Sequence, residues 1–156
     1  MKHTISVLVE NKFGVLARIA GLFSARGYNI ASLAVSETHD PDISCMTIVV
    51  DARDEKILDQ IKKQLNKLID VITVTDFTKK DHIERELILA KVCVPAKDKA
   101  KFELFLKKFL AKIAQHNATT MIVEGVGDQQ HIKELLEGLE KFGIKELIRT
   151  GRIVLA

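Results

Sequence analysis

The sequence predicts an α+β protein built from two βαββαβ sandwiches in tandem, and three observations lead to this fold class. Stretches whose apolar residues alternate with polar ones, as strands require, are interleaved with stretches whose apolar residues recur at helical spacing. In the first half these stretches follow the order strand, helix, strand, strand, helix, strand. This order is typical of a four-stranded antiparallel sheet with both helices on one face. A charged segment separates this half from a second one, in which the order begins again at Leu87.

The first strand and helix form the stretch from residue 5 to residue 30, around which the chain is organised. The strand is predicted to end at Asn11, and it places alternate residues on one side: His3, Ile5, Val7 and Val9. The helix is predicted from one apolar stripe: Val15, Leu16, Ile19, Ala20, Leu22 and Phe23. Arg18 falls on the opposite side of this helix, and Gly27 supplies the left-handed position that ends it.

The turn between this strand and helix has the groups needed to bind an amino acid. The first amides of a helix lack partners within the helix and lie at the positive end of its dipole, so residues 13 to 16 offer N–H groups to a carboxylate. Gly14 allows a ligand to approach the backbone closely. The side-chain oxygen of Asn11 can accept from an ammonium group, and its nitrogen can donate to a carboxylate. The plainer interpretation is that Asn11 is only a helix cap and Gly14 only a turn residue, and an N-x-x-G turn by itself favours that interpretation.

The rest of the first half predicts a hairpin, a helix and a closing strand. The hairpin pairs strands 30–36 and 43–51 across a turn that contains Pro41, and the first of these strands has one face of small side chains. Residues 54–69 form an amphipathic helix with Ile69 among its inward positions, and residues 71–77 form a β-branched strand. The charged stretch from Thr78 to Glu86 then reads as a linker between a domain at 1–78 and one at 84–156.

The second half is expected to repeat this plan with a less clearly marked second strand. A strand from Leu87 is followed by a helix over 100–114, with Ile113 among its inward positions. The chain turns around 113–120, where a very short strand is left open. A strand at 121–127, a helix at 129–142 and a terminal strand or hairpin complete the second half.

Composition and charge disfavour several classes of function. Lysine and arginine outnumber the acidic residues by only 11 to 10 in residues 1–80 and by 13 to 11 in residues 81–156, and aromatic content is 5%. Nucleic-acid binding is therefore disfavoured. No apolar run approaches the ~20 residues of a membrane span, and the N-terminus does not resemble a signal peptide, so a cytoplasmic protein is expected. Cys45 and Cys93 lie in predicted strands and are expected to be buried, reduced thiols.

No pattern in the sequence indicates catalysis or metal binding. The histidines share no metal-ligand spacing with one another or with the cysteines: His3, His39, His82, His116 and His131. Phosphate-binding and nucleophile motifs are missing too. A binding or regulatory protein is favoured, and an enzyme in its own right is the least favoured class.

The stretch VLVENKFGVLARIAGLFSARGYNIASLAVSETHDPDISCMTIVV resembles the ACT domain of the small regulatory subunit of acetolactate (acetohydroxyacid) synthase, and RELILAKV at 85–92 is similar to the opening strand of that family's second domain. The likeness covers nearly the whole chain. It implies two ferredoxin-like domains, the first an ACT domain that binds effector and forms a homodimer. It also implies a non-catalytic subunit that activates a large catalytic subunit and confers feedback inhibition by valine in branched-chain amino acid biosynthesis.

The resemblance implies a site at the seam of two ACT domains. One chain would contribute Asn11, Gly14, Val15 and Leu16, and the neighbouring chain Asn29 and Ile30. Ile30 and Val35 are candidates for the aliphatic pocket, and as strand residues they also fit an ordinary core. Phe13 stands where the family commonly has proline or a small residue, and its bulk could reshape or cover the pocket.

The resemblance also implies which cofactors and partners to expect. This chain would carry no cofactor, and thiamine diphosphate, Mg²⁺ and FAD would belong to the large subunit. Valine or a related branched-chain amino acid would be the ligand. The alternative is a free-standing ACT-type amino-acid sensor that regulates nucleic acid or another enzyme, which steeply salt-dependent nucleic-acid binding would reveal.

Overall fold

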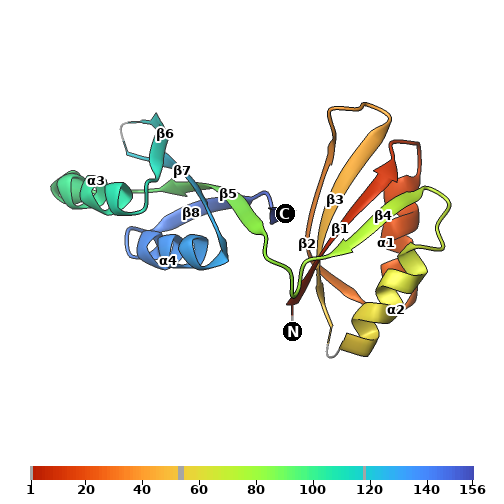
Figure 1. Cartoon of the computed structure of the whole chain (residues 1–156). Helices are drawn as coiled ribbons and strands as arrows, with labels where there is room; N and C mark the ends of the chain where they lie inside the picture. Colours follow the sequence, from red (N-terminus) through yellow and green to blue (C-terminus); the bar gives the residue numbers. More distant parts are fainter. Residues whose placement is uncertain (1, 53–54, 118) are drawn as a thin grey trace. The chain divides into compact units, whose positions relative to one another are not determined.

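The computed structural model describes residues 2–52, 55–117 and 119–156, and the chain divides into two compact units (Figure 1). The first unit contains residues 1–83 together with Arg152–Ala156, and the second contains residues 84–151. No helix in the described part of the chain is both long enough and apolar enough to cross a bilayer.

The first unit is a four-stranded antiparallel sheet with two helices on one face (Figure 1). Its elements are β1 (Lys2–Glu10), α1 (Val15–Ala25), β2 (Asn29–Glu37), β3 (Ile43–Asp51), α2 (Glu55–Leu65) and β4 (Val71–Asp76). The short terminal strand β9 (Ile153–Leu155) is not one of the four strands of this sheet. The strand order β2-β3-β1-β4 places β2 at one edge of the sheet and β4 at the other. The predicted strand and helix order of this half is confirmed.

The core of the first unit lies between the sheet and its two helices. The alternating side of β1 is buried as expected, with Ile5, Val7 and Val9 at 1% exposure or less. It packs against the buried stripe of α1, made of Val15, Ile19, Leu22 and Phe23. Leu16, which the stripe also included, is 44% exposed instead.

The second helix is shorter than its apolar pattern predicts. α2 ends at Leu65, and the chain continues in tight turns in which Leu68 N–H donates to the Leu65 carbonyl and Val71 N–H to the Leu68 carbonyl. These turns rotate Ile69 outward, where it is 95% exposed, so its expected inward place is wrong. The neighbouring Asp70 is buried in its place.

The second unit repeats the topology of the first. Its elements are β5 (Ile83–Val92), a 3₁₀ turn η1 (Ala96–Asp98), α3 (Lys99–Lys108), β6 (Lys112–His116), β7 (Met121–Gly127), α4 (Gln129–Glu140) and β8 (Ile144–Arg149). The order β6-β7-β5-β8 is the counterpart of β2-β3-β1-β4, which confirms the tandem fold class. The core includes Phe102, Ile132, Leu135 and Leu139, all fully buried.

The helix expected over 100–114 stops at Lys108, and Ile113 belongs to the short strand β6. Leu110 adopts a left-handed backbone with φ 52°, and Ala111 N–H donates to the Leu106 carbonyl at 3.0 Å. This is the hydrogen-bond pattern of a Schellman cap, formed here without glycine. Ile113 therefore pairs with Val123 in the sheet and is 38% exposed rather than inward on a helix.

The strand expected from Leu87 begins four residues earlier, at Ile83, so it includes charged residues assigned to the linker. Glu86 is 3% exposed within β5, and both of its carboxylate oxygens accept from Arg149 on β8, at 2.6 and 2.8 Å. A paired charge of this kind can occupy a buried strand position that a lone charge cannot.

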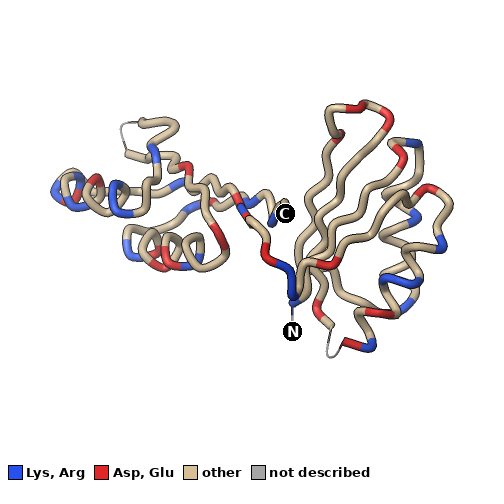
Figure 2. Tube along the Cα trace, in the orientation of Figure 1, with Lys and Arg blue, Asp and Glu red and all other residues tan. Residues whose placement is uncertain are grey.

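Charged residues of both signs are interspersed along both units (Figure 2). The clearest basic cluster lies on α3 and the turn before it: Lys97, Lys99, Lys101, Lys107 and Lys108. Cys45 and Cys93 are unpaired thiols, as expected, but both are half-buried rather than buried.

Candidate functional site

The turn that joins β1 to α1 leaves backbone donors open. Gly14 caps the helix with φ 81° and ψ −4°, a left-handed conformation, and no side chain caps the helix. Val15 N–H donates to the Lys12 carbonyl at 3.3 Å. Within the described part of the chain, the N–H groups of Phe13, Gly14 and Leu16 have no hydrogen-bond partner. These donors lie at the positive end of the α1 dipole, where an anion is favoured.

Asn11 is not the cap of this helix. Its backbone N–H donates to the Asp42 carbonyl at 2.7 Å, and its Nδ2 donates to Glu37 Oε1 at 3.1 Å and to the Pro41 carbonyl at 2.8 Å. The side chain therefore ties the end of β1 to the loop between β2 and β3. Its nitrogen is occupied, so the expected donation to a ligand carboxylate does not fit this structure. Its Oδ1 has no partner in the described residues and can accept from an ammonium group.

Arg18 lies at this turn, and the sequence analysis missed it. Its Nε and Nη2 donate to Asp70 Oδ2 at 2.9 and 2.7 Å. A Cβ built on Gly14 would lie 3.2 Å from Arg18 Nη1, so the guanidinium stands beside the bare backbone of the glycine. The sequence did offer one signal for this placement: Arg18 is four residues after Gly14, and residues four apart lie on the same side of a helix. Asp70 is 52 residues away in sequence and gave no such signal.

The expected side chains around the turn differ in exposure. Val15 is 3% exposed and belongs to the core, whereas Leu16 is 44% exposed and faces outward beside the open amides. Phe13 is fully exposed and packs over nothing, so it does not cover the turn. A ligand can therefore reach the backbone of residues 13 to 16 from solvent.

Asn29 and Ile30 do not join the turn within one chain. Asn29 begins β2 opposite Asp51, whereas Glu37, which accepts from Asn11, ends the same strand. Eight residues of strand correspond to about 26 Å at ~3.3 Å per residue. Asn29 is exposed at the edge of the sheet, and Ile30 is half-buried against the core.

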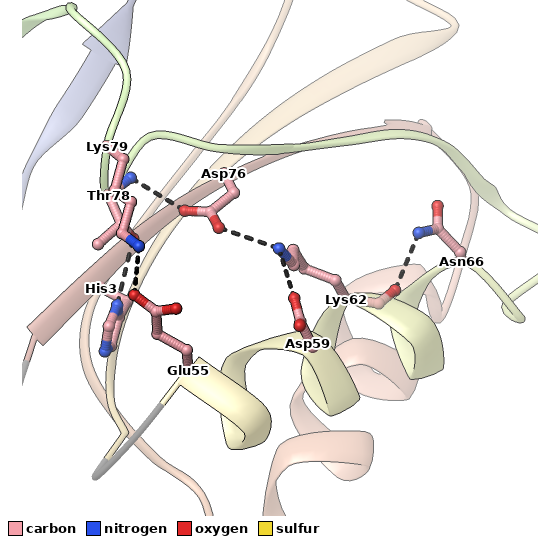
Figure 3. A network of polar contacts seen from close by, with 8 residues as sticks. All are labelled: His3, Glu55, Asp59, Lys62, Asn66, Asp76, Thr78 and Lys79. Carbon is pink, nitrogen blue, oxygen red and sulfur yellow. Dashed lines mark hydrogen bonds and ion pairs between the residues drawn. The ribbon is translucent and has the colours of Figure 1, made fainter.

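A second group of polar residues joins α2 to the end of β4 (Figure 3). Lys62 Nζ lies 2.8 Å from Asp59 Oδ1 and 3.1 Å from Asp76 Oδ2, and hydrogen bonds to both carboxylates raise the pKa of Lys62. Burial would raise the pKa of Asp76, but hydrogen bonds from Thr78 and Lys62 hold that pKa below its usual value. These contacts fasten the helix to the strand.

The same group borders a groove of about 460 Å³. On its rim Lys79 pairs with Glu55. Nearby, His3 Nδ1 lies 3.2 Å from Thr78 Oγ1. The two lysines of this network have carboxylate partners, which indicates a structural clasp rather than a binding site. Among the described residues, no group of three His, Cys, Asp or Glu side chains can hold a metal ion.

Two family models match the chain, one in each half. Residues 5–73 match the AHAS small subunit-like ACT domain, and residues 85–156 match the small subunit of acetolactate synthase. The first match includes the turn at Gly14 and the edge strand β2.

Curated relatives and one solved structure agree with these models over the full length. A probable acetolactate synthase small subunit from Archaeoglobus fulgidus is 45% identical over 155 residues, covering 99% of this chain and 96% of its own. The acetolactate synthase small subunit of Aquifex aeolicus is 44% identical over 156 residues, covering 99% and 80%. The crystal structure of the acetolactate synthase small subunit from Thermotoga maritima superposes with a TM-score of 0.90 at 33% identity, covering 99% and 96%.

Proposed function

The chain belongs to the family of acetolactate synthase small subunits, and from that premise we propose that it activates a catalytic large subunit and makes the enzyme sensitive to valine. The small subunit is a regulatory component, and the large subunit is its implied partner. Thiamine diphosphate, Mg²⁺ and FAD would reside on that partner. Binding of valine would report the level of the end product to the enzyme.

The observation that carries this proposal is the turn at Gly14. Its unpaired N–H groups can hold a carboxylate, and Oδ1 of Asn11, three residues before Gly14, can accept from an ammonium group. An amino acid presents both of these groups on one carbon. A branched aliphatic side chain suits the apolar surface of the exposed Leu16.

The position of β2 supports a homodimer that completes the site. β2 is an edge strand, so its outer backbone groups can pair with the same strand of a second copy. In an antiparallel pair centred on Leu33, Asn29 of the second copy would lie opposite Glu37 of the first, because both are four residues from the centre. Glu37 is bound by Asn11, so this register brings Asn29 to the turn from the other chain.

Reconstitution with the large subunit tests the function directly. We expect the chain to raise the rate of the large subunit supplied with its cofactors, and valine to lower that rate by an allosteric coupling of about 1 to 3 kcal/mol. Calorimetry should show valine binding to the chain alone. A chain that neither binds valine nor changes the rate would contradict the proposal.

The variant Asn29→Ala tests the seam separately from activation. We expect weaker inhibition by valine, because the second chain would no longer contribute its amide, and little change in activation of the large subunit. Inhibition curves at fixed subunit ratio measure both quantities. Inhibition unchanged by the substitution would place the site elsewhere.

A further inference from the structure

We infer that Arg18, held in place by Asp70, is the cation that binds the carboxylate of the effector at the α1 turn. The inference rests on the proposed function, since it assigns a residue to the valine site. It also fixes the orientation of the ligand, with its carboxylate at Gly14 and Arg18 and its ammonium group at Asn11.

The guanidinium has donors to spare on the side of the turn. Nε and Nη2 both donate to one oxygen, Oδ2 of Asp70. Nη1 carries two further N–H groups and has no partner among the described residues. It is this atom that lies 3.2 Å from the position of a Cβ on Gly14. The free end of the guanidinium therefore stands over the one residue whose backbone a ligand can approach most closely.

Nη1 of Arg18 is important for the ligand carboxylate because other side-chain donors near the turn already have hydrogen-bond partners. Asn11 Nδ2 already donates to Glu37 and to the Pro41 carbonyl, and Val15 N–H donates to the Lys12 carbonyl. Lys12 Nζ lies 2.7 Å from Glu10 Oε2, so this ammonium group is paired. The backbone amides near Gly14 and Nη1 of Arg18 remain without a partner among the described residues. A hydrogen bond in which both groups are charged is roughly twice as strong as a neutral one, so Arg18 would supply much of the affinity for the carboxylate.

Asp70 prepares Arg18 for this role before ligand arrives. The Asp70 side chain is only 10% exposed, and its backbone carbonyl accepts from Glu10 N–H at 2.9 Å, so the carboxylate is fixed at the end of β1. An arginine held by two hydrogen bonds loses less freedom on binding than a mobile one, which strengthens binding. The ion pair also balances the charge of the buried carboxylate when the site is empty.

Calorimetry on the full chain with valine and with valinamide tests the assignment, because valinamide keeps the ammonium group and side chain but lacks the carboxylate. We expect Arg18→Gln to weaken valine binding by roughly 10- to 100-fold and to leave valinamide binding nearly unchanged. The matched control is Arg26→Gln at the other end of α1, where the guanidinium donates to the Leu22 carbonyl and Gln64 Oε1. This control should bind both ligands as the unsubstituted chain does.

Three outcomes would overturn the assignment. The first is that Arg18→Gln binds valine as tightly as the unsubstituted chain. The second is that Arg18→Gln weakens the binding of valine and of valinamide equally, which would show a structural role. If Arg18→Gln does not fold, Arg18→Lys serves in its place, because lysine keeps the positive charge but lacks the planar set of N–H donors of a guanidinium. This variant should show a reduced preference for valine over valinamide. An unchanged preference in that variant would also contradict the assignment. Failure of the unsubstituted chain to bind valine would instead refute the proposed function itself.

Discussion

At the scale of single residues, Gly14 allows the left-handed conformation of the turn and also leaves the backbone there open to a ligand. Its φ of 81° suits glycine, and the space where its Cβ would lie is bordered by Arg18. The sequence predicted the glycine turn and the side chains buried from β1, because both follow from local pattern. It did not predict the pair of Arg18 with Asp70, since helical periodicity places Arg18 on the solvent side and says nothing about a residue 52 positions away.

The substitution Gly14→Ala is expected to lower the free energy of unfolding by about 1 to 2 kcal/mol, because a residue with a Cβ is strained at positive φ. It should also weaken valine binding, since the new methyl group would lie 3.2 Å from Arg18 Nη1 and crowd the guanidinium and the approach to the backbone. Urea denaturation and calorimetry measure the two effects.

Gly21→Ala is the matched control on the same helix. A Cβ there meets nothing within 4 Å, so the variant should gain up to ~1 kcal/mol from helix propensity and bind valine normally. Equal effects of the two substitutions would contradict a special role for Gly14.

At the scale of elements, charged pairs shape one strand and fasten one helix to its neighbouring strand. β5 extends back to Ile83 because Glu86 is paired with Arg149, and α2 is fastened to β4 through Lys62. Apolar periodicity cannot predict such boundaries. Apolar periodicity predicted a helix over 100–114, because the apolar residues recur at helical spacing past Leu110 and the helix cap there lacks the usual glycine. The helix α3 ends at Lys108.

The pair of Glu86 and Arg149 should respond asymmetrically to substitution. Arg149→Ala leaves a buried carboxylate unpaired and is expected to cost about 3 kcal/mol. Glu86→Gln leaves a half-exposed guanidinium that water can solvate, so the cost should be about 1 kcal/mol. Urea denaturation of the two variants measures both costs. A larger cost for Glu86→Gln would show that the arginine, rather than the carboxylate, needs the partner.

The clasp at Asp76 should make stability depend on pH on the acid side. Hydrogen bonds from Thr78 and Lys62 hold the pKa of this carboxyl below its usual value in the folded chain, so the stabilisation is present above that usual value and is lost as the pH falls through the folded pKa. Asp76→Asn should therefore be less stable than the unsubstituted chain at pH 6, with the difference shrinking below about pH 4. Thermal unfolding across this range measures it, and Asp81→Asn on the exposed loop serves as control. A difference that does not change with pH would contradict the clasp.

At the scale of the whole molecule, the proposed dimer depends on the register of β2 with its copy. If the pair is centred on Leu33, residue 32 of one chain faces residue 34 of the other. The double variant Ser32→Lys with Ala34→Lys would set lysines opposite each other twice and should dissociate the dimer. Ser32→Asp with Ala34→Lys would set opposite charges there and should restore it. Analytical ultracentrifugation distinguishes them, and equal masses for both variants would contradict this register.

The tandem repeat is symmetric in its strands but not at the entrances of its first helices. In the second unit Pro95 has no N–H, Asp98 N–H donates to the Pro95 carbonyl, and Lys99 N–H donates to the Ala96 carbonyl. Two donors before α3 are thus satisfied within the chain, and no glycine stands there to bare the backbone as Gly14 does before α1. Of the two similar units, only the first would bind an amino acid, and saturation should occur at one molecule of amino acid per polypeptide rather than two.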